Sequence, residues 1–301
     1  MTITKLLEFF DRHRERGDPL VLVTVLETRG STYSKAGAQM LINADGVFRG
    51  MLSGGCLEGD LAVRAGVVIE SGRAAVVEYD LGADDELWGL GVGCDGLIRV
   101  QLEPLRPDDG YAPFAAVADI LRGHQACDVV LAVADDAGSE LVVRVVPPPR
   151  LLVLGGGLDA EPVVRIAAEL GWRVTVCDHR PAYLEAGDFD AAEAVLCRPA
   201  GELADAVVVD EYDAAIVMSH HLASDRSYLA ALAESSVRYI GLLGPPARRD
   251  RLLRELGAAA DRLEDRVYGP AGLDIGGRGP GPIALSILAE VQQVLAEEPA
   301  R

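Results

Sequence analysis

The sequence predicts an α/β protein whose C-terminal half folds as a doubly wound parallel sheet and whose N-terminal half forms an α+β domain. After residue 150, strand-like apolar runs alternate regularly with helical patterns. Before residue 146, turn residues interrupt the strand-like runs, and few helical patterns lie between these runs. Three consecutive prolines, Pro147 to Pro149, lie between the two patterns, and such a run favours an extended connection. We therefore expect domains at residues 1–146 and 147–301.

The N-terminal half shows two helical patterns among its strands. In chain order we expect strands at 20–26 and 39–42, a helix at 56–71, strands at 75–79 and 97–102, a helix near 112–122, and strands at 128–133 and 140–146. This irregular order of helices and strands is typical of an α+β domain.

The C-terminal half alternates its elements more regularly. We expect a strand at 151–154, a helix at 159–170, strands at 173–177, 193–197 and 214–219, a helix at 222–235, a strand at 239–243, and helices at 245–256 and 282–297. In the last helix Ile283, Ile287 and Val291 recur at helical spacing, which indicates one buried face. Repeated strand and helix units predict a parallel sheet.

Composition limits the classes of partner and compartment. The chain has 301 residues, 50% of them hydrophobic, so two ordinary domains can each bury a core. Its formal net charge of −19 argues against nucleic acid or an anionic membrane as the main partner, because like charges repel. The five cysteines form an odd set without a CxxC pair, and the N-terminus has no long apolar core. We therefore expect a cytoplasmic protein without a signal peptide, a membrane helix or a metal site.

A glycine turn that ends in a cysteine is the first candidate site. Ser53, Gly54, Gly55 and Cys56 directly precede an apolar helical pattern, so Ser53 or Gly54 would cap a helix and Cys56 would lie in its first turn. Unpaired backbone N–H groups would stabilise a thiolate there, and the glycines would let a phosphate or a flat ring approach the backbone. A small buried cysteine on a tight turn explains the same residues.

A second glycine-flanked cysteine, Cys94, lies in the segment GVGCDG. If Cys94 converges with Cys56, the two thiols would frame a soft-ligand or sulfur-handling site near backbone N–H groups. The sequence does not show whether the two cysteines meet.

The third candidate follows the first strand of the C-terminal half, where residues 155–160 read GGGLDA. This fits the GxGxxA form of the dinucleotide-binding turn, in which Gly155 and Gly157 let the backbone approach a pyrophosphate at the helix N-terminus. Asp178 ends the next strand, about 20 residues downstream, where an acid meets ribose hydroxyls and favours NAD over NADP. A Rossmann fold with a vestigial nucleotide site is the alternative.

Further polar candidates are expected near this turn. Arg173 and Arg180 could hold the 2′-phosphate of NADP. His220 and His221 follow a strand at its carboxyl end, where one of them could face the crevice as a proton donor, and a capping or packing role explains them equally well. Gly244 forms another glycine turn, before a basic helix start, which fits a phosphate contact or a solvated face.

Several segments together resemble one family. They are GSTYSKAGAQMLI, SGGCLEGDL, GVGCDG, YIGLLGPPARRDRLL, and GLDIGG with PIALSILAE, and over nearly its whole length the chain is similar to the XdhC/CoxI family of accessory proteins for molybdenum hydroxylases. The resemblance implies an N-terminal domain of that family joined to a Rossmann-type domain. It also implies that the protein binds molybdenum cofactor, protects it during sulfuration with a cysteine desulfurase, and delivers it to an enzyme of the xanthine dehydrogenase or carbon monoxide dehydrogenase type.

By this resemblance Cys56 and Cys94 correspond to the family's glycine-flanked cysteines, and Gly155, Gly157 and Asp178 to its nucleotide-type loop. The function that fits both the residues and the resemblance is a cofactor chaperone, expected as a homodimer. The candidate cofactor-binding residues are Ser53, Gly54, Gly55, Cys56, Cys94, Gly155, Gly157, Asp178, His220 and Gly244.

Two alternatives stay open. An NAD(P)-dependent oxidoreductase acting on a small carbonyl compound would use His220 or His221 as its proton donor. A protein-interaction module whose two sites have decayed would bind neither ligand and would still bind a molybdenum hydroxylase.

The chain departs from the family's pattern at two positions. Leu158 stands where the family often has histidine, and Asp95 puts a carboxylate beside the second thiol.

Overall fold

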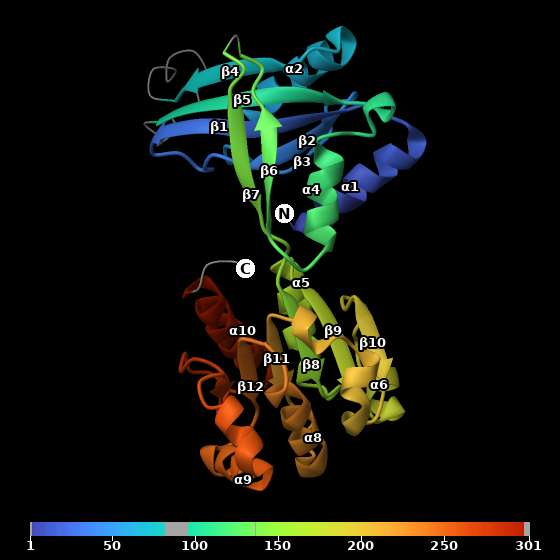
Figure 1. The fold of residues 1–301 in the computed structure, drawn as a ribbon, viewed down its shortest axis with the longest axis vertical. Coiled ribbons are helices and arrows are strands. Elements are labelled where there is room, and N and C mark those ends of the chain that lie inside the picture. Colours follow the sequence, from blue (N-terminus) through green and yellow to red (C-terminus); the bar gives the residue numbers. More distant parts are fainter. Residues whose placement is uncertain (1, 82–95, 136, 298–301) are drawn as a thin grey trace. The chain divides into compact units, whose positions relative to one another are not determined.

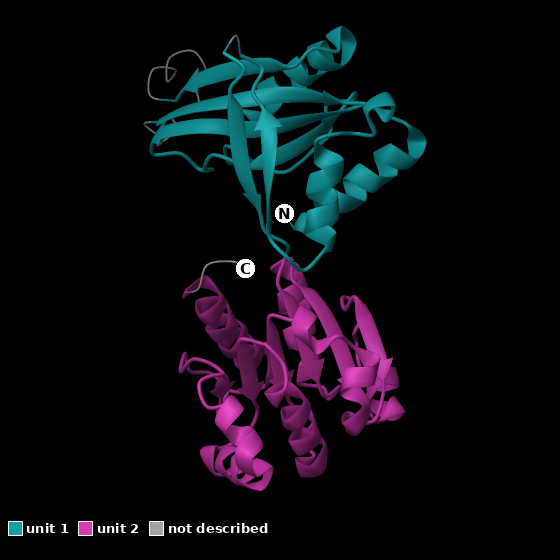
Figure 2. Ribbon diagram, viewed as in Figure 1, with its two compact units in different colours: residues 1–147 teal, residues 148–301 magenta. Residues whose placement is uncertain are grey.

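The computed structural model describes residues 2–81, 96–135 and 137–297. The chain forms two compact units, residues 1–147 (unit 1) and 148–301 (unit 2), coloured separately in Figure 2. None of the helices in the described part of the chain is long and apolar enough to cross a membrane.

Unit 1 contains a five-stranded antiparallel sheet in the order β3-β2-β1-β5-β4 and a separate hairpin of β6 and β7. Its elements are α1 (Ile3–Arg16), β1 (Leu20–Gly30), β2 (Gln39–Asn43), β3 (Phe48–Arg49), α2 (Glu58–Ser71), β4 (Ala75–Asp80), β5 (Gly96–Leu105), the 3-10 helix η1 (Pro107–Asp109), α4 (Phe114–Arg122), β6 (Cys127–Ala132) and β7 (Glu140–Val145).

Both faces of this sheet are covered, because alternate residues of a strand point to opposite sides. Leu20 and Leu22 of β1 pack in the core with α1, α4 and the hairpin, whereas Val21 and Val23 pack in the core beneath α2. Figure 1 shows α2 on one side of the sheet and α1 with α4 on the other. The sheet therefore holds the start of α2, and the cysteine loop before it, on a rigid support.

Helix α1 lies outside the elements predicted from the sequence, because charged residues interrupt its apolar pattern. Leu6, Phe9 and Phe10 are nevertheless buried against the sheet. The start of α2 also differs from the prediction, as described below.

Unit 2 contains a six-stranded parallel sheet in the order β10-β9-β8-β11-β12-β13. Its elements are β8 (Arg150–Leu154), α5 (Ala160–Glu169), β9 (Arg173–Asp178), α6 (Pro181–Ala186), β10 (Ala194–Cys197), η2 (Ala200–Glu202), α7 (Leu203–Ala206), η3 (Val209–Glu211), β11 (Ala214–Val217), α8 (Leu222–Ala233), β12 (Tyr239–Leu242), α9 (Pro246–Leu256), η4 (Gly257–Arg262), β13 (Val267–Tyr268) and α10 (Pro280–Glu297). Numbered within the unit, the order is 3-2-1-4-5-6, the Rossmann order, which confirms the predicted doubly wound sheet.

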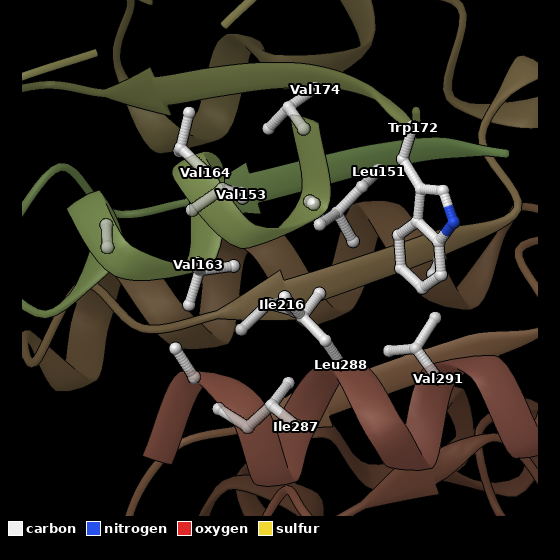
Figure 3. Close-up of a cluster of buried hydrophobic side chains, with 14 of the residues drawn as sticks. Leu151, Val153, Val163, Val164, Trp172, Val174, Ile216, Ile287, Leu288 and Val291 are labelled. Atoms are coloured by element: carbon white, nitrogen blue, oxygen red, sulfur yellow. The ribbon is translucent and has the colours of Figure 1, made fainter. Parts of the chain in front are cut away.

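Helices cover both faces of the parallel sheet. On one face, drawn in Figure 3, Leu151 and Ile216 of the strands pack against Val163 of α5 and Leu288 of α10. On the other face, the strand residues pack against α8 and α9. The strand order reverses between β8 and β11, and in such sheets the crevice at the carboxyl ends of the strands beside this reversal is where ligands bind.

Candidate functional site

The cysteine loop of unit 1 lies just before α2. The helix begins at Glu58 and has Leu57 as its N-cap residue, so the prediction that Cys56 lies in the first turn is wrong. The physical reason is the position of the capping contact: the Ser53 hydroxyl oxygen accepts a hydrogen bond from the Leu57 N–H at 2.7 Å. Ser53 therefore closes a turn upstream of the helix, and Cys56 lies within that turn.

A buried carboxylate organises this loop. Glu58 is 2% exposed, and its Oε1 accepts hydrogen bonds from the N–H groups of Leu52 and Ser53, at 2.8 and 2.9 Å. Its Oε2 accepts from the Ser53 hydroxyl at 2.5 Å and from the Gly55 N–H at 3.0 Å. Burial raises the pKa of Glu58, but these hydrogen bonds outweigh burial, so the pKa lies below its ordinary value.

The loop also contains two exposed glycines and a half-buried cysteine. Gly54 and Gly55 have φ angles of 76° and 113°, which other residues rarely adopt, and both glycines are exposed. Cys56 is half-buried and forms no disulfide. Among the described residues, the N–H groups of Gly54 and Cys56 have no hydrogen-bond partner. Cys94 lies outside the described residues, so its convergence with Cys56 stays a prediction.

The glycine loop of unit 2 connects β8 to α5, as predicted, but neighbouring protein atoms occupy the space around its first two glycines. A Cβ on Gly155 would lie 2.5 Å from the backbone carbonyl of Met218, and one on Gly156 would lie 2.7 Å from the Leu184 side chain. A Cβ on Gly157 would meet only Oδ1 of Asp159, at 2.8 Å. The backbone of Met218 thus requires a glycine at position 155, whereas a side chain at position 156 would displace the end of Leu184.

Asp178 ends β9 beside this loop, and donors of the protein occupy the hydrogen-bond acceptor positions of its carboxylate. It is fully buried and accepts four hydrogen bonds: from Gly156 N–H at 2.7 Å, and from Arg180 N–H, Nε and Nη2 at 2.9, 2.9 and 2.7 Å. Burial raises the pKa of Asp178, but the Arg180 and Gly156 hydrogen bonds outweigh burial and lower it. A carboxylate has about four lone-pair positions, so no acceptor remains for a ribose hydroxyl.

The two arginines proposed for a 2′-phosphate are also engaged. Arg180 holds Asp178 and donates to the Ser219 carbonyl at 3.0 Å. Arg173 begins β9, at the end of the strand away from the glycine loop, and forms an ion pair with Glu193. These residues do not fit the ribose and 2′-phosphate contacts expected from the sequence.

The neighbouring histidines contact different partners. His220 has a φ of 58° and is exposed, and its Nε2 lies 2.7 Å from Oδ2 of Asp159 at the start of α5. His221 is the N-cap residue of α8 and accepts from the Ser224 N–H. It lines a shallow pocket of about 290 Å³ together with His179, whose ring centroid lies 5.9 Å from that of His221. The other lining residues are Pro199, Ala200, Gly201, Ala223, Ser224 and Ser227.

Gly244 lies between the end of β12 at Leu242 and the start of the basic helix α9 at Pro246. The first arginine of that helix is bound by the protein itself. Gly244 has a φ of 123°, and a Cβ there would meet the Arg248 side chain at 2.7 Å. Arg248 donates to the buried carboxylate of Asp225 at 2.7 Å, and Asp225 accepts from the Ser219 hydroxyl at 2.5 Å. Arg248 is therefore not a free phosphate ligand.

The predicted site residues divide between the two units. Ser53, Gly54, Gly55 and Cys56 form one loop in unit 1. Five others lie at the carboxyl edge of the parallel sheet in unit 2, namely Gly155, Gly157, Asp178, His220 and Gly244, and Cys94 lies outside the described residues. Within the ranges that the structure describes, no three His, Cys, Asp or Glu side chains gather to hold a metal ion.

Three residues that shape these sites, Glu58, His179 and Leu184, are not among the predicted site residues. The signal for Glu58 is an acid in the first helical turn, but its spacing from Ser53 does not match a capping box. His179 directly follows Asp178, which offers a positional signal. Leu184 gives no signal, because its contact with Gly156 depends on where α6 packs.

Comparisons with known proteins match both parts of the chain. The family model described as XdhC Rossmann domain matches residues 151–291, and the one described as XdhC and CoxI family matches residues 13–80. A protein of Bacillus subtilis (strain 168), named as a probable subunit of xanthine dehydrogenase, is 30% identical over 93% of this chain and 94% of its own length. The molybdenum cofactor insertion chaperone PaoD of Escherichia coli (strain K12) is 28% identical over 92% of this chain and 84% of its own.

A solved structure agrees with these matches. The crystal structure of a xanthine dehydrogenase from Bacillus halodurans is 31% identical in sequence and superposes with a TM-score of 0.84, covering 99% of this chain and 97% of that chain.

Proposed function

This chain belongs to the XdhC and CoxI family, and from that premise we propose that it is an accessory protein for a molybdenum hydroxylase. It binds molybdenum cofactor, assists sulfuration of the cofactor together with a cysteine desulfurase, and supports insertion into an enzyme of the xanthine dehydrogenase or carbon monoxide dehydrogenase type. The relative named as a molybdenum cofactor insertion chaperone, aligned over 92% of this chain, supports the proposal.

The observation that carries the proposal is the half-buried Cys56 thiol on a glycine loop, where two N–H groups have no partner within the part of the chain that the structure describes. Molybdenum cofactor combines a flat pterin, a phosphate and a metal-bound dithiolene, and soft thiolate ligands suit such sulfur-rich metal centres. Exposed glycines let a flat ring approach the backbone without a steric clash. A loop of this kind fits binding and release of the cofactor, and it needs no catalytic group.

The oxidoreductase alternative has weaker support. Unit 2 has the Rossmann strand order, but the four hydrogen bonds to Asp178 leave no acceptor for the ribose of a nicotinamide dinucleotide. Of the two expected proton donors, His220 is held by Asp159 and His221 caps α8. Titration with NADH and NADPH, followed by nicotinamide fluorescence, separates the two functions, since the chaperone proposal expects no saturable binding below about millimolar concentrations.

The remaining parts of the proposal concern compartment and assembly. Four cysteines in the described part of the chain are free thiols, which fits a reducing cytoplasm. A homodimer is the assembly that we propose, because two-fold symmetric dimers are the commonest oligomers.

The test measures retained cofactor. The full-length protein is incubated with molybdenum cofactor released from a molybdenum hydroxylase, desalted, and assayed for pterin by fluorescence after oxidation. We expect the wild type to retain pterin and Cys56→Ala to retain at least about tenfold less, because loss of a metal-site contact costs that much affinity. Cys127→Ala is the matched control, since Cys127 is an exposed cysteine on β6. Equal retention by wild type and Cys56→Ala would remove Cys56 from the site.

A further inference from the structure

The loop that carries Cys56 is folded around an anion of the protein itself. All four lone-pair positions of the Glu58 carboxylate are used by Leu52 N–H, Ser53 N–H, the Ser53 hydroxyl and Gly55 N–H. Glycine loops with several backbone donors commonly bind an external phosphate. Here the donors at positions 52, 53 and 55 are already taken by Glu58.

The same contacts define which donors are left. The N–H groups of Gly54 and Cys56 have no partner among the described residues, and they flank the Gly55 N–H that binds Glu58. Ser53 links the carboxylate to the helix, because its hydroxyl donates to Glu58 and accepts from Leu57 N–H. The positions of the Cys56 thiol and of the two remaining amides therefore depend on Glu58.

We propose that Glu58 is the positioning residue of the cofactor site: its carboxylate shapes the loop so that the Cys56 thiol and the amides of Gly54 and Cys56 face an anionic group of the guest. This inference rests on the proposed function. The group is a negatively charged terminal atom, either on the molybdenum or on the cofactor phosphate. Glu58 itself is buried and does not touch the guest.

The first experiment uses the cofactor-free protein and measures the loop alone. Glu58→Gln keeps the size of the side chain but places an NH₂ group where an oxygen accepted two hydrogen bonds, so the loop loosens. We expect iodoacetamide to alkylate Cys56 on the order of tenfold faster, followed on the Cys56 peptide by mass spectrometry. Glu70→Gln, on the exposed side of the same helix, is the matched control and keeps the wild-type rate. An unchanged or slower rate in Glu58→Gln, or an equal change in Glu70→Gln, overturns the proposal.

The second experiment is a double-mutant cycle on cofactor retention. Glu58→Gln lowers retention about tenfold in the wild-type background and clearly less in the Cys56→Ala background, because only the two amides are then left for Glu58 to position. A merely structural role would lower retention by the same factor in both backgrounds, and such additive losses overturn the proposal. If the wild type retains no cofactor, the proposed function fails, whereas the alkylation rates still decide the role of Glu58.

Two further arms complete the test. Molybdenum-free molybdopterin keeps the phosphate and lacks the metal. An effect of Glu58→Gln on the retention of both ligands assigns the amides to the phosphate, and an effect on the metal-bearing form alone assigns them to the metal end.

If Glu58→Gln fails to fold, Ser53→Ala replaces it, because that change removes only the hydroxyl that links Glu58 to Leu57. It should raise the alkylation rate of Cys56 about threefold, and an unchanged rate overturns the proposal.

Discussion

Two buried carboxylates, one in each unit, share the same arrangement. Glu58 and Asp178 each accept four hydrogen bonds, and each binds at least one N–H group of a glycine loop. Glycine loops suggest binding of an external anion when only the sequence is known. In this protein each loop is organised by an internal anion, which leaves fewer donors for a ligand than the sequence indicates.

Asp178→Asn tests this account at the residue scale. Asparagine places a donor against the donors of Gly156 and Arg180, so we expect unit 2 to lose about 2 kcal/mol of unfolding free energy, measured with urea. The expected loss is small for a buried carboxylate because Arg180, its main partner, is partly exposed to water. Because the folded-state pKa of Asp178 is lowered, its contribution is complete above the unfolded pKa of about 3.9 and is lost as the pH falls through the lower folded-state pKa.

The difference between wild type and Asp178→Asn should therefore stay constant from about pH 5 to pH 8 and shrink below about pH 4. Asp190→Asn is the control, since Asp190 is exposed in the same unit, and it should change the unfolding free energy by less than about 0.5 kcal/mol. Equal stability of Asp178→Asn and wild type at pH 7 would contradict the account.

Among the single helices, strands and turns, those determined by a local sequence pattern were predicted. The strand, glycine turn and helix from β8 to α5 were predicted because apolar periodicity and turn residues are local signals. The predicted start of α2 was wrong because the loop before this helix is shaped by the hydrogen bond that the Ser53 hydroxyl donates to the Glu58 carboxylate. The saturation of Asp178 could not be predicted, since it depends on how Arg180 folds back at the end of β9.

Two alanine substitutions in the β8–α5 loop separate packing from ligand approach. Gly155→Ala would place a Cβ 2.5 Å from backbone atoms of Met218 at a φ of 132°, so we expect unit 2 to lose about 3 kcal/mol or more. Gly157→Ala would meet only the Asp159 carboxylate, a side-chain end that can move, and should cost about 1 kcal/mol or less. Thermal unfolding followed by circular dichroism measures both, and equal losses would show that the loop is packed differently.

At the scale of the whole molecule, each unit has its own hydrophobic cores. Unit 1 has one core on each face of its antiparallel sheet, and unit 2 has one on each face of its parallel sheet. The parallel sheet of unit 2 is complete within residues 148–301, because all six strands and the helices that cover them belong to that range. A domain boundary between residues 146 and 147 stays a prediction from the proline run, and a fragment experiment tests it.

We expect a fragment of residues 148–301 to fold without unit 1, because its two cores contain no residue from outside that range. Urea unfolding followed by circular dichroism should give one cooperative transition, as small single domains usually do. A fragment of residues 160–301 is the control: it lacks β8, which lies between β9 and β11 at the centre of the sheet, so each neighbour loses its hydrogen bonds to that strand and the sheet is split in two. The control should remain unfolded. A non-cooperative transition in the longer fragment would mean that unit 2 needs unit 1 to fold, and the two-domain organisation expected from the sequence would then be wrong.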